Sequence, residues 1–447
     1  MDRLLIAGTS SGSGKTSISS GIMSVLSDGG AVQPYKIGPD FIDPMYHRAL
    51  TGRPSRNLDG YMMPEDAMRG HFARTSAGAD IAVLEGVRGL YEGLEALSDA
   101  ASTAQLAKSL RCPVVLVVNA RSLTRSAAAM VNGFRSFDPD VNIAGVILNN
   151  VSGEGHRRKL TEAMAHYTDV EVLGVVRRRP EESLPQRHLG LHTLHDGDAL
   201  NGLRERLRSL VEEVDIDRLK EIASEAPALE APEEPARSGG GLEGLIAAVP
   251  DDRAFCFYYP ENIEALEAAG ATTVRYSPVD GDMLPEADIH YLGGGYPELY
   301  AAELAGNRDF LEGLENANEE GAAMHGECGG MMVLCQDLKD SQGRSHRMAG
   351  VFPASAEMAP QRQGPCYVEA TARGDGRRLR AHEFHYSRVR LHKELPYAFD
   401  LLRGSGIDGS HDGMVSGNAV GTYMHRHAVA DQGWLRMLAT MAQRHRG

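Results

Sequence analysis

Residues 4–26 read LLIAGTSSGSGKTSISSGIMSVL, and this stretch decides the fold of the first half of the chain. An apolar, strand-like run enters a turn of glycine and serine, and a helical pattern follows directly. At such a turn, free backbone N–H groups and the positive end of the helix dipole attract phosphate. The stretch therefore predicts a P-loop between a strand and a helix of an α/β sheet.

The spacing of this loop departs from the common pattern. Five residues separate Gly8 from Gly14, whereas the usual GxxxxGK[ST] pattern has four. Lys15 can still bridge the β- and γ-phosphates of ATP, and the Thr16 hydroxyl can ligate Mg²⁺. The alternative is a turn that is merely rich in glycine and serine. We predict that ATP is bound by Gly12, Ser13, Gly14, Lys15 and Thr16.

Carboxylates follow the loop along the chain. Glu85 ends the apolar run IAVLE, and the carboxyl edge of a parallel sheet is where such a residue would hold Mg²⁺. Asp40 and Asp43 stand among proline and glycine in KIGPDFIDP. From composition alone, two aspartates in such a turn are more often a turn device than a metal site. The residues themselves therefore favour Glu85 as the carboxylate partner of Thr16.

A second chemical site is indicated in GAAMHGECGGMMVL, residues 321–334. A strand reaches His325 and a helical segment starts after Cys328, so this cysteine would lie on a strained nucleophile elbow. The helix N-terminus would lower the pKa of the thiol, and the N–H of Gly329 could stabilise an oxyanion. Cys328 is therefore predicted to be a nucleophile.

The partners of this cysteine come from distant segments. VGTYMHRH ends a strand at His425, which we predict to be the general base. Gly294 and Gly295 follow another strand in YLGGGYPE and are predicted as further oxyanion donors. Taken singly, each residue could be a packing or loop residue. The remaining cysteines lack such surroundings and are interpreted as packing residues: Cys112, Cys256, Cys335 and Cys366.

The organisation of the chain favours two α/β domains. A length of 447 residues exceeds one ordinary hydrophobic core. Residues 226–241 concentrate Pro, Ala, Glu and Gly and are predicted to form a linker. Residues 1–225 alternate apolar runs with helical stretches, which is typical of a doubly wound parallel sheet. Residues 242–447 repeat this alternation and predict a second α/β sheet.

Composition excludes several classes of function. Acidic residues outnumber basic ones by 61 to 46, and a net charge of −15 argues against a nucleic-acid partner. No run of about 18 uncharged apolar residues occurs, so no membrane partner is expected. The N-terminus enters a strand pattern without the basic and apolar regions of a signal peptide. We expect a cytoplasmic protein.

Nine blocks of the sequence, in this order, resemble those of the cobyrinic acid a,c-diamide synthase family. The resemblance runs over essentially the whole chain. The blocks are GTSSGSGKT, YKIGPDFIDPMYH, GRPSRNLD, EGVRGLYEG, FCFYYPENIEALEAAGA, YLGGGYPE, HGECGGMM, HEFHYS and GTYMHRH.

The resemblance implies a synthetase domain similar to dethiobiotin synthetase, followed by a class I glutamine amidotransferase domain. It implies that ATP phosphorylates the a and c side-chain carboxylates of a tetrapyrrole, and that ammonia from L-glutamine converts the acyl phosphates into amides. By the same resemblance Mg²⁺ is held by Thr16, Asp43 and Glu85. The substrate and acyl-phosphate region contains Asp40, Arg88 and Glu92.

The chain departs from related patterns at two positions. Many class I amidotransferases carry glutamate two residues after the histidine, where this chain has His427. A Cys–His dyad is therefore expected, with His385 or Glu383 as less favoured third members. Arg88 stands where many corrin-pathway members are expected to have Met. It favours the branch that amidates nickel-sirohydrochlorin on the coenzyme F430 route of methanogenesis, whereas cobyrinate would place the enzyme in cobalamin biosynthesis.

Two alternatives stay open. A cobyric acid synthase has the same two activities but amidates other side chains, and chain length and the GPDFIDP block favour the diamide synthase. A P-loop ATPase switch of the partitioning type would usually carry a lysine early in the loop, where this chain has Ser10. A homodimer is also among the expectations.

Overall fold

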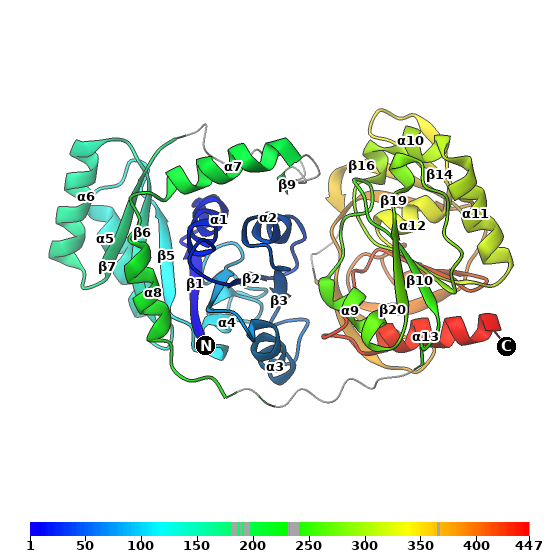
Figure 1. Cartoon of the computed structure of the whole chain (residues 1–447), viewed down its shortest axis with the longest axis horizontal. Coiled ribbons are helices and arrows are strands. Elements are labelled where there is room, and N and C mark those ends of the chain that lie inside the picture. Colours follow the sequence, from blue (N-terminus) through cyan, green and yellow to red (C-terminus); the bar gives the residue numbers. More distant parts are fainter. Residues whose placement is uncertain are drawn as a thin grey trace. The chain divides into compact units, whose positions relative to one another are not determined.

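The chain forms two compact units, Met1–Glu234 and Pro235–Gly447, each with its own hydrophobic core (Figure 1). The computed structural model describes residues 1–179, 186–187, 190–191, 197–230, 232, 241–363 and 367–446. Residues 231 and 233–240 of the predicted linker, and Cys366, lie outside this description. Within its described part, the linker contacts the first unit through the carbonyl oxygens of Pro227 and Ala228, which accept hydrogen bonds from arginines.

The first unit contains one parallel sheet. Among the described residues, its seven strands run in the order β3-β2-β4-β1-β5-β6-β7. These strands are β1 (Asp2–Gly8), β2 (Val32–Ile37), β3 (Arg56–Leu58), β4 (Ile81–Glu85), β5 (Val114–Asn119), β6 (Ile143–Val151) and β7 (Glu171–Arg177). Two short strands, β8 (Gln186–Arg187) and β9 (Gly190–Leu191), pair separately. The doubly wound parallel sheet predicted from the apolar runs is confirmed.

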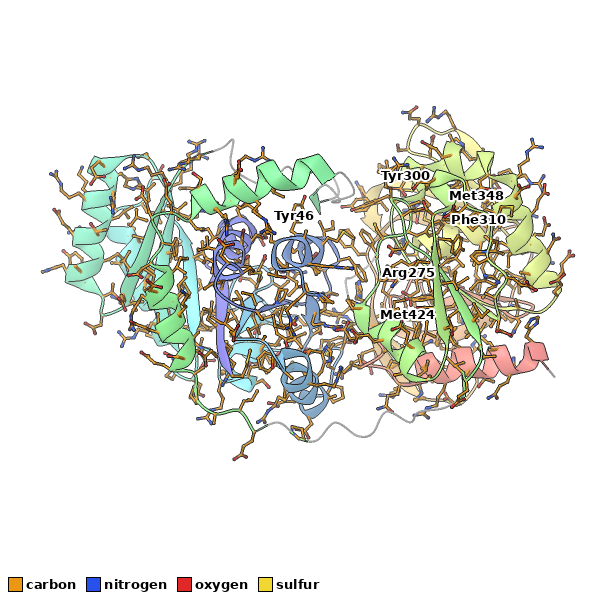
Figure 2. All side chains as sticks on the ribbon, viewed as in Figure 1. Tyr46, Arg275, Tyr300, Phe310, Met348 and Met424 are labelled. Atoms are coloured by element: carbon orange, nitrogen blue, oxygen red, sulfur yellow. The ribbon has the colours of Figure 1, made fainter. Side chains whose placement is uncertain are left out.

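Helices cover both faces of this sheet, which is why its central strands are buried throughout. The helices are α1 (Lys15–Leu26), α2 (Ile42–Thr51), α3 (Glu65–Ser76), α4 (Thr103–Ser109), α5 (Arg125–Phe137), α6 (Glu154–Tyr167), α7 (Gly197–Leu210) and α8 (Ile216–Ser224). One core joins the strands to α1, α7 and α8 through residues such as Ile18, Leu210 and Leu219. A smaller cluster around Tyr46 connects α2 to α7 (Figure 2).

The second unit is built on a mixed sheet. In its described part, nine strands run in the order β11-β10-β12-β13-β22-β21-β20-β17-β18. Pairing is parallel from β11 to β22 and antiparallel beyond. The strands are β10 (Ile246–Pro250), β11 (Thr272–Tyr276), β12 (Ile289–Leu292), β13 (Ala323–Glu327), β17 (Tyr367–Ala372), β18 (Arg378–His382), β20 (Tyr397–Arg403), β21 (His411–Ser416) and β22 (Ala419–Thr422).

A smaller sheet and several helices complete the second unit. The sheet runs β15-β14-β16-β19, from β14 (Cys335–Lys339), β15 (Ser345–Arg347), β16 (Phe352–Gln363) and β19 (His385–Leu391). The helices are α9 (Pro260–Ala268), α10 (Ala301–Gly306), α11 (Arg308–Glu319), α12 (Gly329–Leu334) and α13 (Gly433–Arg446), with short 3₁₀ turns at Pro278–Asp280 and Pro297–Leu299. Phe310 and Met348 belong to one core cluster and Met424 to another (Figure 2).

No helix in the described part of the chain combines the length and the apolar character needed to cross a bilayer.

Candidate functional site

The phosphate loop lies between β1 and α1, as the sequence predicted. Gly12 and Gly14 have φ values of 75° and 95°, which lie in the left-handed region that glycine adopts most easily. The side-chain amide of Asn149, at the end of β6, donates to the carbonyl oxygen of Ser13 at 2.9 Å. Asn149 therefore holds the loop from β6, which β5 separates from β1 in the sheet, a role that the sequence analysis did not single out.

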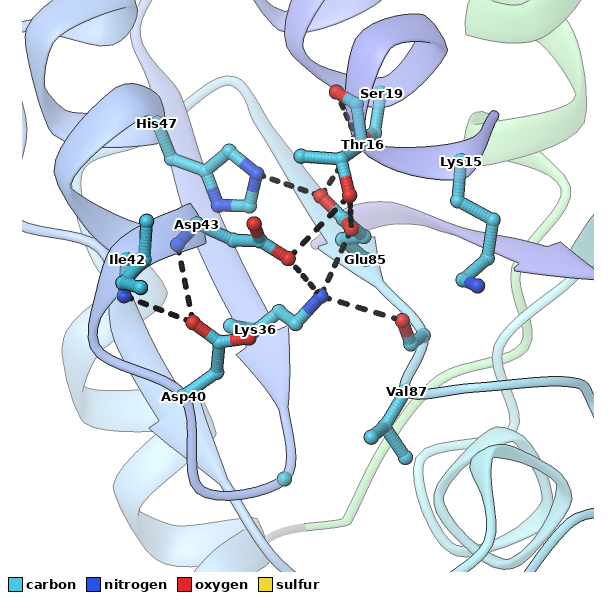
Figure 3. Close-up of polar contacts among 12 residues, drawn as sticks. Lys15, Thr16, Ser19, Lys36, Asp40, Ile42, Asp43, His47, Glu85 and Val87 are labelled. Atoms are coloured by element: carbon cyan, nitrogen blue, oxygen red, sulfur yellow. Dashed lines mark hydrogen bonds and ion pairs between the residues drawn. The ribbon is translucent and has the colours of Figure 1, made fainter. Parts of the chain in front are cut away.

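A buried cluster of charged side chains adjoins this loop (Figure 3). Glu85 ends β4, and both its carboxylate oxygens are bonded. Oε1 accepts from the Thr16 hydroxyl at 2.7 Å and from Lys36 Nζ at 2.8 Å. Oε2 accepts from the Ser19 hydroxyl at 2.7 Å and lies 2.8 Å from His47 Nε2.

Lys36, on β2, connects the two carboxylates predicted as metal ligands. Its Nζ forms ion pairs with both Asp43 and Glu85. Burial alone would lower the pKa of Lys36, but these two carboxylates raise it above the ordinary value. Burial and the neighbouring charge of Lys36 lower the pKa of Lys15, whose Nζ donates to the backbone carbonyl of Arg88. Two lysines thus lie beside the phosphate loop, and the sequence analysis singled out only Lys15.

Oxygen groups of the kind that Mg²⁺ prefers gather here, around the ammonium group of Lys36. The Thr16 hydroxyl is 2.7 Å from Glu85 Oε1 and 3.4 Å from Asp43 Oδ2, so three oxygen groups converge. Hard oxygen ligands of this kind suit Mg²⁺. Within the described ranges no group of three or more His, Cys, Asp or Glu side chains is arranged to hold a metal, so a cation here would depend on the hydroxyl of Thr16.

The remaining residues predicted for the first unit lie on nearby loops. Asp40 Oδ1 accepts the backbone N–H groups of Ile42 and Asp43 at 2.8 and 3.1 Å, which stabilises the start of α2 (Figure 3). Arg88 is exposed and has a φ of 48°, in the left-handed region. Glu92 is also exposed, and its carboxylate lies against the α-carbon of Gly89.

In the second unit, Cys328 lies on an elbow between β13 and α12. Its φ of 48° and ψ of −101° place a non-glycine residue in a strained conformation, as predicted for a nucleophile elbow. Its N–H donates to the carbonyl oxygen of Thr422 at 2.7 Å. β13 and β22 pair with Glu327 opposite Thr422, and the chain leaves β22 toward His425. Sheet register thus brings the two distant segments together.

His425 lies against the predicted glycine turn. A Cβ on Gly294 would approach the His425 ring to 2.5 Å, and a Cβ on Gly329 would lie 3.0 Å from the backbone nitrogen of Gly295. Only glycine fits this closely at both positions. The structure therefore brings together the elbow, the glycine turn and the imidazole that the sequence placed far apart.

Two residues beside His425 were missed by the sequence analysis. Glu327 Oε2 lies 3.4 Å from His425 Nδ1. The ring of His382 stacks on that of His425 with centroids 5.0 Å apart, and their backbones form an antiparallel bridge. His382 begins the HEFHYS block, and Glu327 directly precedes the cysteine, so both were within motifs already quoted.

The residues considered as third members have other contacts of their own. The carboxylate of Glu383 accepts the backbone N–H groups of Ser405 and Gly406 at 2.6 and 2.9 Å. The ring of His385 stacks on Tyr423 with centroids 3.6 Å apart. The HEFHYS block therefore does contact the base, but through its first histidine.

The net pKa of the thiol is raised, although the backbone N–H of Gly329 at the helix N-terminus acts in the expected, lowering direction. Burial raises the pKa of Cys328 to about 12, and the charge of Glu298 adds to the rise, while the backbone N–H of Gly329 opposes it. Burial likewise raises the pKa of Glu298 to about 7. α12 has only six residues, and its lowering effect on the thiol pKa is smaller than the rise caused by the loss of solvation. The thiol therefore needs a base to accept its proton.

Two family models match this chain. Residues 4–191 match the CobQ/CobB/MinD/ParA nucleotide binding domain, and residues 246–433 match the CobB/CobQ-like glutamine amidotransferase domain. The first match contains the phosphate loop and the second contains Cys328 and His425.

Curated relatives match almost the full length. A cobyrinate a,c-diamide synthase from Methanosarcina acetivorans is 44% identical over 96% of this chain and 93% of that protein. Its counterpart from Methanosarcina barkeri is 43% identical over 99% of this chain and 96% of its own length. A third, from Methanothermobacter thermautotrophicus, is 43% identical over 96% of each chain.

Proposed function

The chain belongs to the cobyrinate a,c-diamide synthase family, and from this premise we propose that it amidates the a and c side-chain carboxylates of a tetrapyrrole in cobalamin biosynthesis. It is an amide-forming ligase that hydrolyses glutamine. The observation that carries the proposal is that both units, with their two sites, lie within the alignment to relatives of that name. The predicted fold class, a P-loop α/β unit followed by a glutamine amidotransferase unit, is confirmed.

The first unit activates the carboxylate. The γ-phosphoryl group of ATP passes to a carboxylate oxygen of the substrate, which gives an acyl phosphate and ADP. Lys15 and the backbone N–H groups from Gly12 to Thr16 bind the phosphates. Thr16, Asp43 and Glu85 would hold Mg²⁺, which would neutralise phosphate charge when bound. Asp40, Arg88 and Glu92 are assigned to the substrate and acyl-phosphate region.

The second unit supplies ammonia. Cys328 gives its proton to His425, and the thiolate attacks the side-chain carbonyl carbon of glutamine. The N–H groups of Gly329, Gly294 and Gly295 are proposed to stabilise the oxyanion. His425 returns the proton to the leaving nitrogen as this intermediate collapses, so ammonia is released and a thioester remains, which water hydrolyses to glutamate. Ammonia then attacks the acyl carbon of the acyl phosphate, and phosphate leaves.

Two macrocycles are candidates for the substrate. Relatives named for cobyrinate favour that substrate. Nickel-sirohydrochlorin is the second candidate. Arg88 is exposed, and its own backbone carbonyl accepts the hydrogen bond of Lys15, so its side chain could pair with an additional carboxylate near the phosphate loop.

The test is incubation of the enzyme with ATP, Mg²⁺ and glutamine, against cobyrinic acid and nickel-sirohydrochlorin in parallel. Mass spectrometry should detect the gain of two amides on the natural substrate. Amide gain at other side chains would instead indicate a cobyric acid synthase type of activity. ATP hydrolysis without amide gain on either macrocycle would contradict the proposal and favour the switch ATPase.

A further inference from the structure

The imidazole proposed to activate Cys328 has a carboxylate neighbour that no sequence pattern indicated. His425 Nδ1 lies 3.4 Å from Oε2 of Glu327, the residue immediately before the cysteine, and 2% and 1% of the two side chains are exposed. We propose that Glu327 is a positioning residue that fixes the tautomer and orientation of His425 during glutamine hydrolysis. This inference rests on the proposed function of the glutaminase site.

Strand pairing explains why Glu327 reaches this histidine. Glu327 is the last residue of β13 and lies opposite Thr422, the last residue of β22. The nucleophile follows directly after the first strand, and the base follows three residues after the second. The same register thus places the elbow, its preceding carboxylate and the base in one buried region.

Other side chains hold this carboxylate in place. Tyr291 donates its hydroxyl to Oε2 at 3.2 Å, and His325 Nε2 lies 3.2 Å from Oε1. Burial alone would raise the pKa of Glu327, but the adjacent His325 and His425 outweigh it and lower the pKa to about 2. Glu327 is therefore ionised at neutral pH.

An ionised Glu327 decides where the protons of His425 lie. It accepts the Nδ1–H of the imidazole, so Nε2 carries a lone pair that can take the thiol proton of Cys328. The imidazolium formed in that step is then stabilised by the adjacent carboxylate. The distance of 3.4 Å is long for a hydrogen bond, as is common in active sites before substrate binds.

The chain contains a matched control for this pair. Glu261 Oε2 lies 3.4 Å from His427 Nε2, with neither side chain exposed. His427 occupies the position two residues after the base where many class I enzymes carry their third member. The Glu261–His427 pair thus matches the Glu327–His425 pair in charge, burial and distance, but it does not include the proposed base.

The test measures glutamine hydrolysis by the full-length protein carrying Glu327→Gln, Glu327→Asp or Glu261→Gln. We expect kcat of Glu327→Gln to fall by on the order of 100-fold or more with KM for glutamine nearly unchanged, because Glu327 acts through His425. Glu327→Asp keeps the charge and should recover part of the loss. Glu261→Gln should stay within about threefold of the parent kcat, because Glu261 pairs with His427 and not with the base.

Several outcomes would overturn the inference. One is a kcat of Glu327→Gln equal to that of the parent. Another is a large loss of kcat in Glu261→Gln while Glu327→Gln stays active, because that result would assign the positioning role to the pair of Glu261 and His427. If Glu327→Gln does not fold, as judged by thermal unfolding, the aspartate variant decides: lower kcat at unchanged KM supports the role, and unchanged kcat refutes it. Absence of glutaminase activity in the parent would instead contradict the proposed function itself.

Discussion

At the scale of single residues, burial governs the chemistry of the glutaminase site. The thiol of Cys328 is buried, its pKa is raised to about 12, and the nearby Glu298 contributes to that rise. A thiol in this state is nucleophilic only when a base takes its proton during attack. His425 is the imidazole that the structure places at the glycine turn beside the elbow.

The first residue-scale prediction concerns the nucleophile. Cys328→Ala should abolish amide synthesis from glutamine and leave synthesis from added ammonium salts, because only the release of ammonia uses the thiolate. Both rates can be measured by amide gain on the macrocycle. An equal loss with both nitrogen sources would contradict the assignment of ammonia release to this residue.

The second residue-scale prediction concerns the pH dependence of the thiol. The pKa of Glu298 is raised to about 7, so this carboxylate carries its charge above that pH and adds to the rise in the thiol pKa that burial causes. Glu298→Gln removes the charge and should shift the midpoint of Cys328 alkylation by iodoacetamide to lower pH. Peptide mapping identifies the modified cysteine. The exposed Glu303→Gln is the control, and the same midpoint in both variants would refute this coupling.

At the scale of elements, the elbow depends on close backbone approach. α12 begins directly after Cys328, and Gly330 in its first turn faces the end of β12. A Cβ on Gly330 would lie 2.1 Å from the carbonyl oxygen of Leu292, a backbone atom that cannot move without disturbing the sheet. In the phosphate loop the close approach is to a side chain, because a Cβ on Gly14 would lie 2.1 Å from the side-chain amide nitrogen of Asn149.

The prediction at this scale is that Gly330→Ala destabilises the second unit. Overpacking against backbone commonly costs about 1–3 kcal/mol, and the displaced elbow should also reduce glutaminase activity. Thermal unfolding and glutamine hydrolysis measure the two effects. Gly374→Ala is the matched control, since a Cβ there meets nothing within 4 Å. Equal unfolding temperatures for the two variants would show that the elbow tolerates a side chain.

At the scale of the whole molecule, two units with separate cores carry separate chemical steps. Carboxylate activation is proposed for Met1–Glu234 and ammonia release for Pro235–Gly447. Each site is complete within its own unit as far as its assigned residues are concerned. The predicted homodimer, the cytoplasmic location and the nickel-sirohydrochlorin branch stay predictions.

The prediction at this scale is that Lys15→Ala separates the two activities. Amide synthesis should fall by roughly 100-fold or more with either glutamine or ammonia, because the phosphates lose a buried cation before ammonia is needed. Glutamine hydrolysis, measured as glutamate release without macrocycle, should remain. Substantial ammonia-driven synthesis in this variant would mean that the nucleotide site has been misplaced.

The sequence by itself determined the parallel sheet of the first unit, the phosphate loop and the elbow at Cys328. These features are encoded locally, because a strand, a glycine turn and a helix that follow one another limit the backbone to few arrangements. The nine blocks also determined the family, which full-length relatives confirm. His425 could be predicted as a base from its place at a strand end, although 97 residues separate it from Cys328.

Only the tertiary structure decided which side chains surround these residues. Lys36 joins Glu85, which lies 49 positions away in the sequence, because β2 and β4 pair with Lys36 opposite Glu85. Glu327 and His382 reach His425 through β13, β22 and β18 in the same way. The raised pKa of Cys328 is likewise a result of burial, which only the packed fold decides. Sheet register brings distant residues together, and no local pattern encodes which of them will meet.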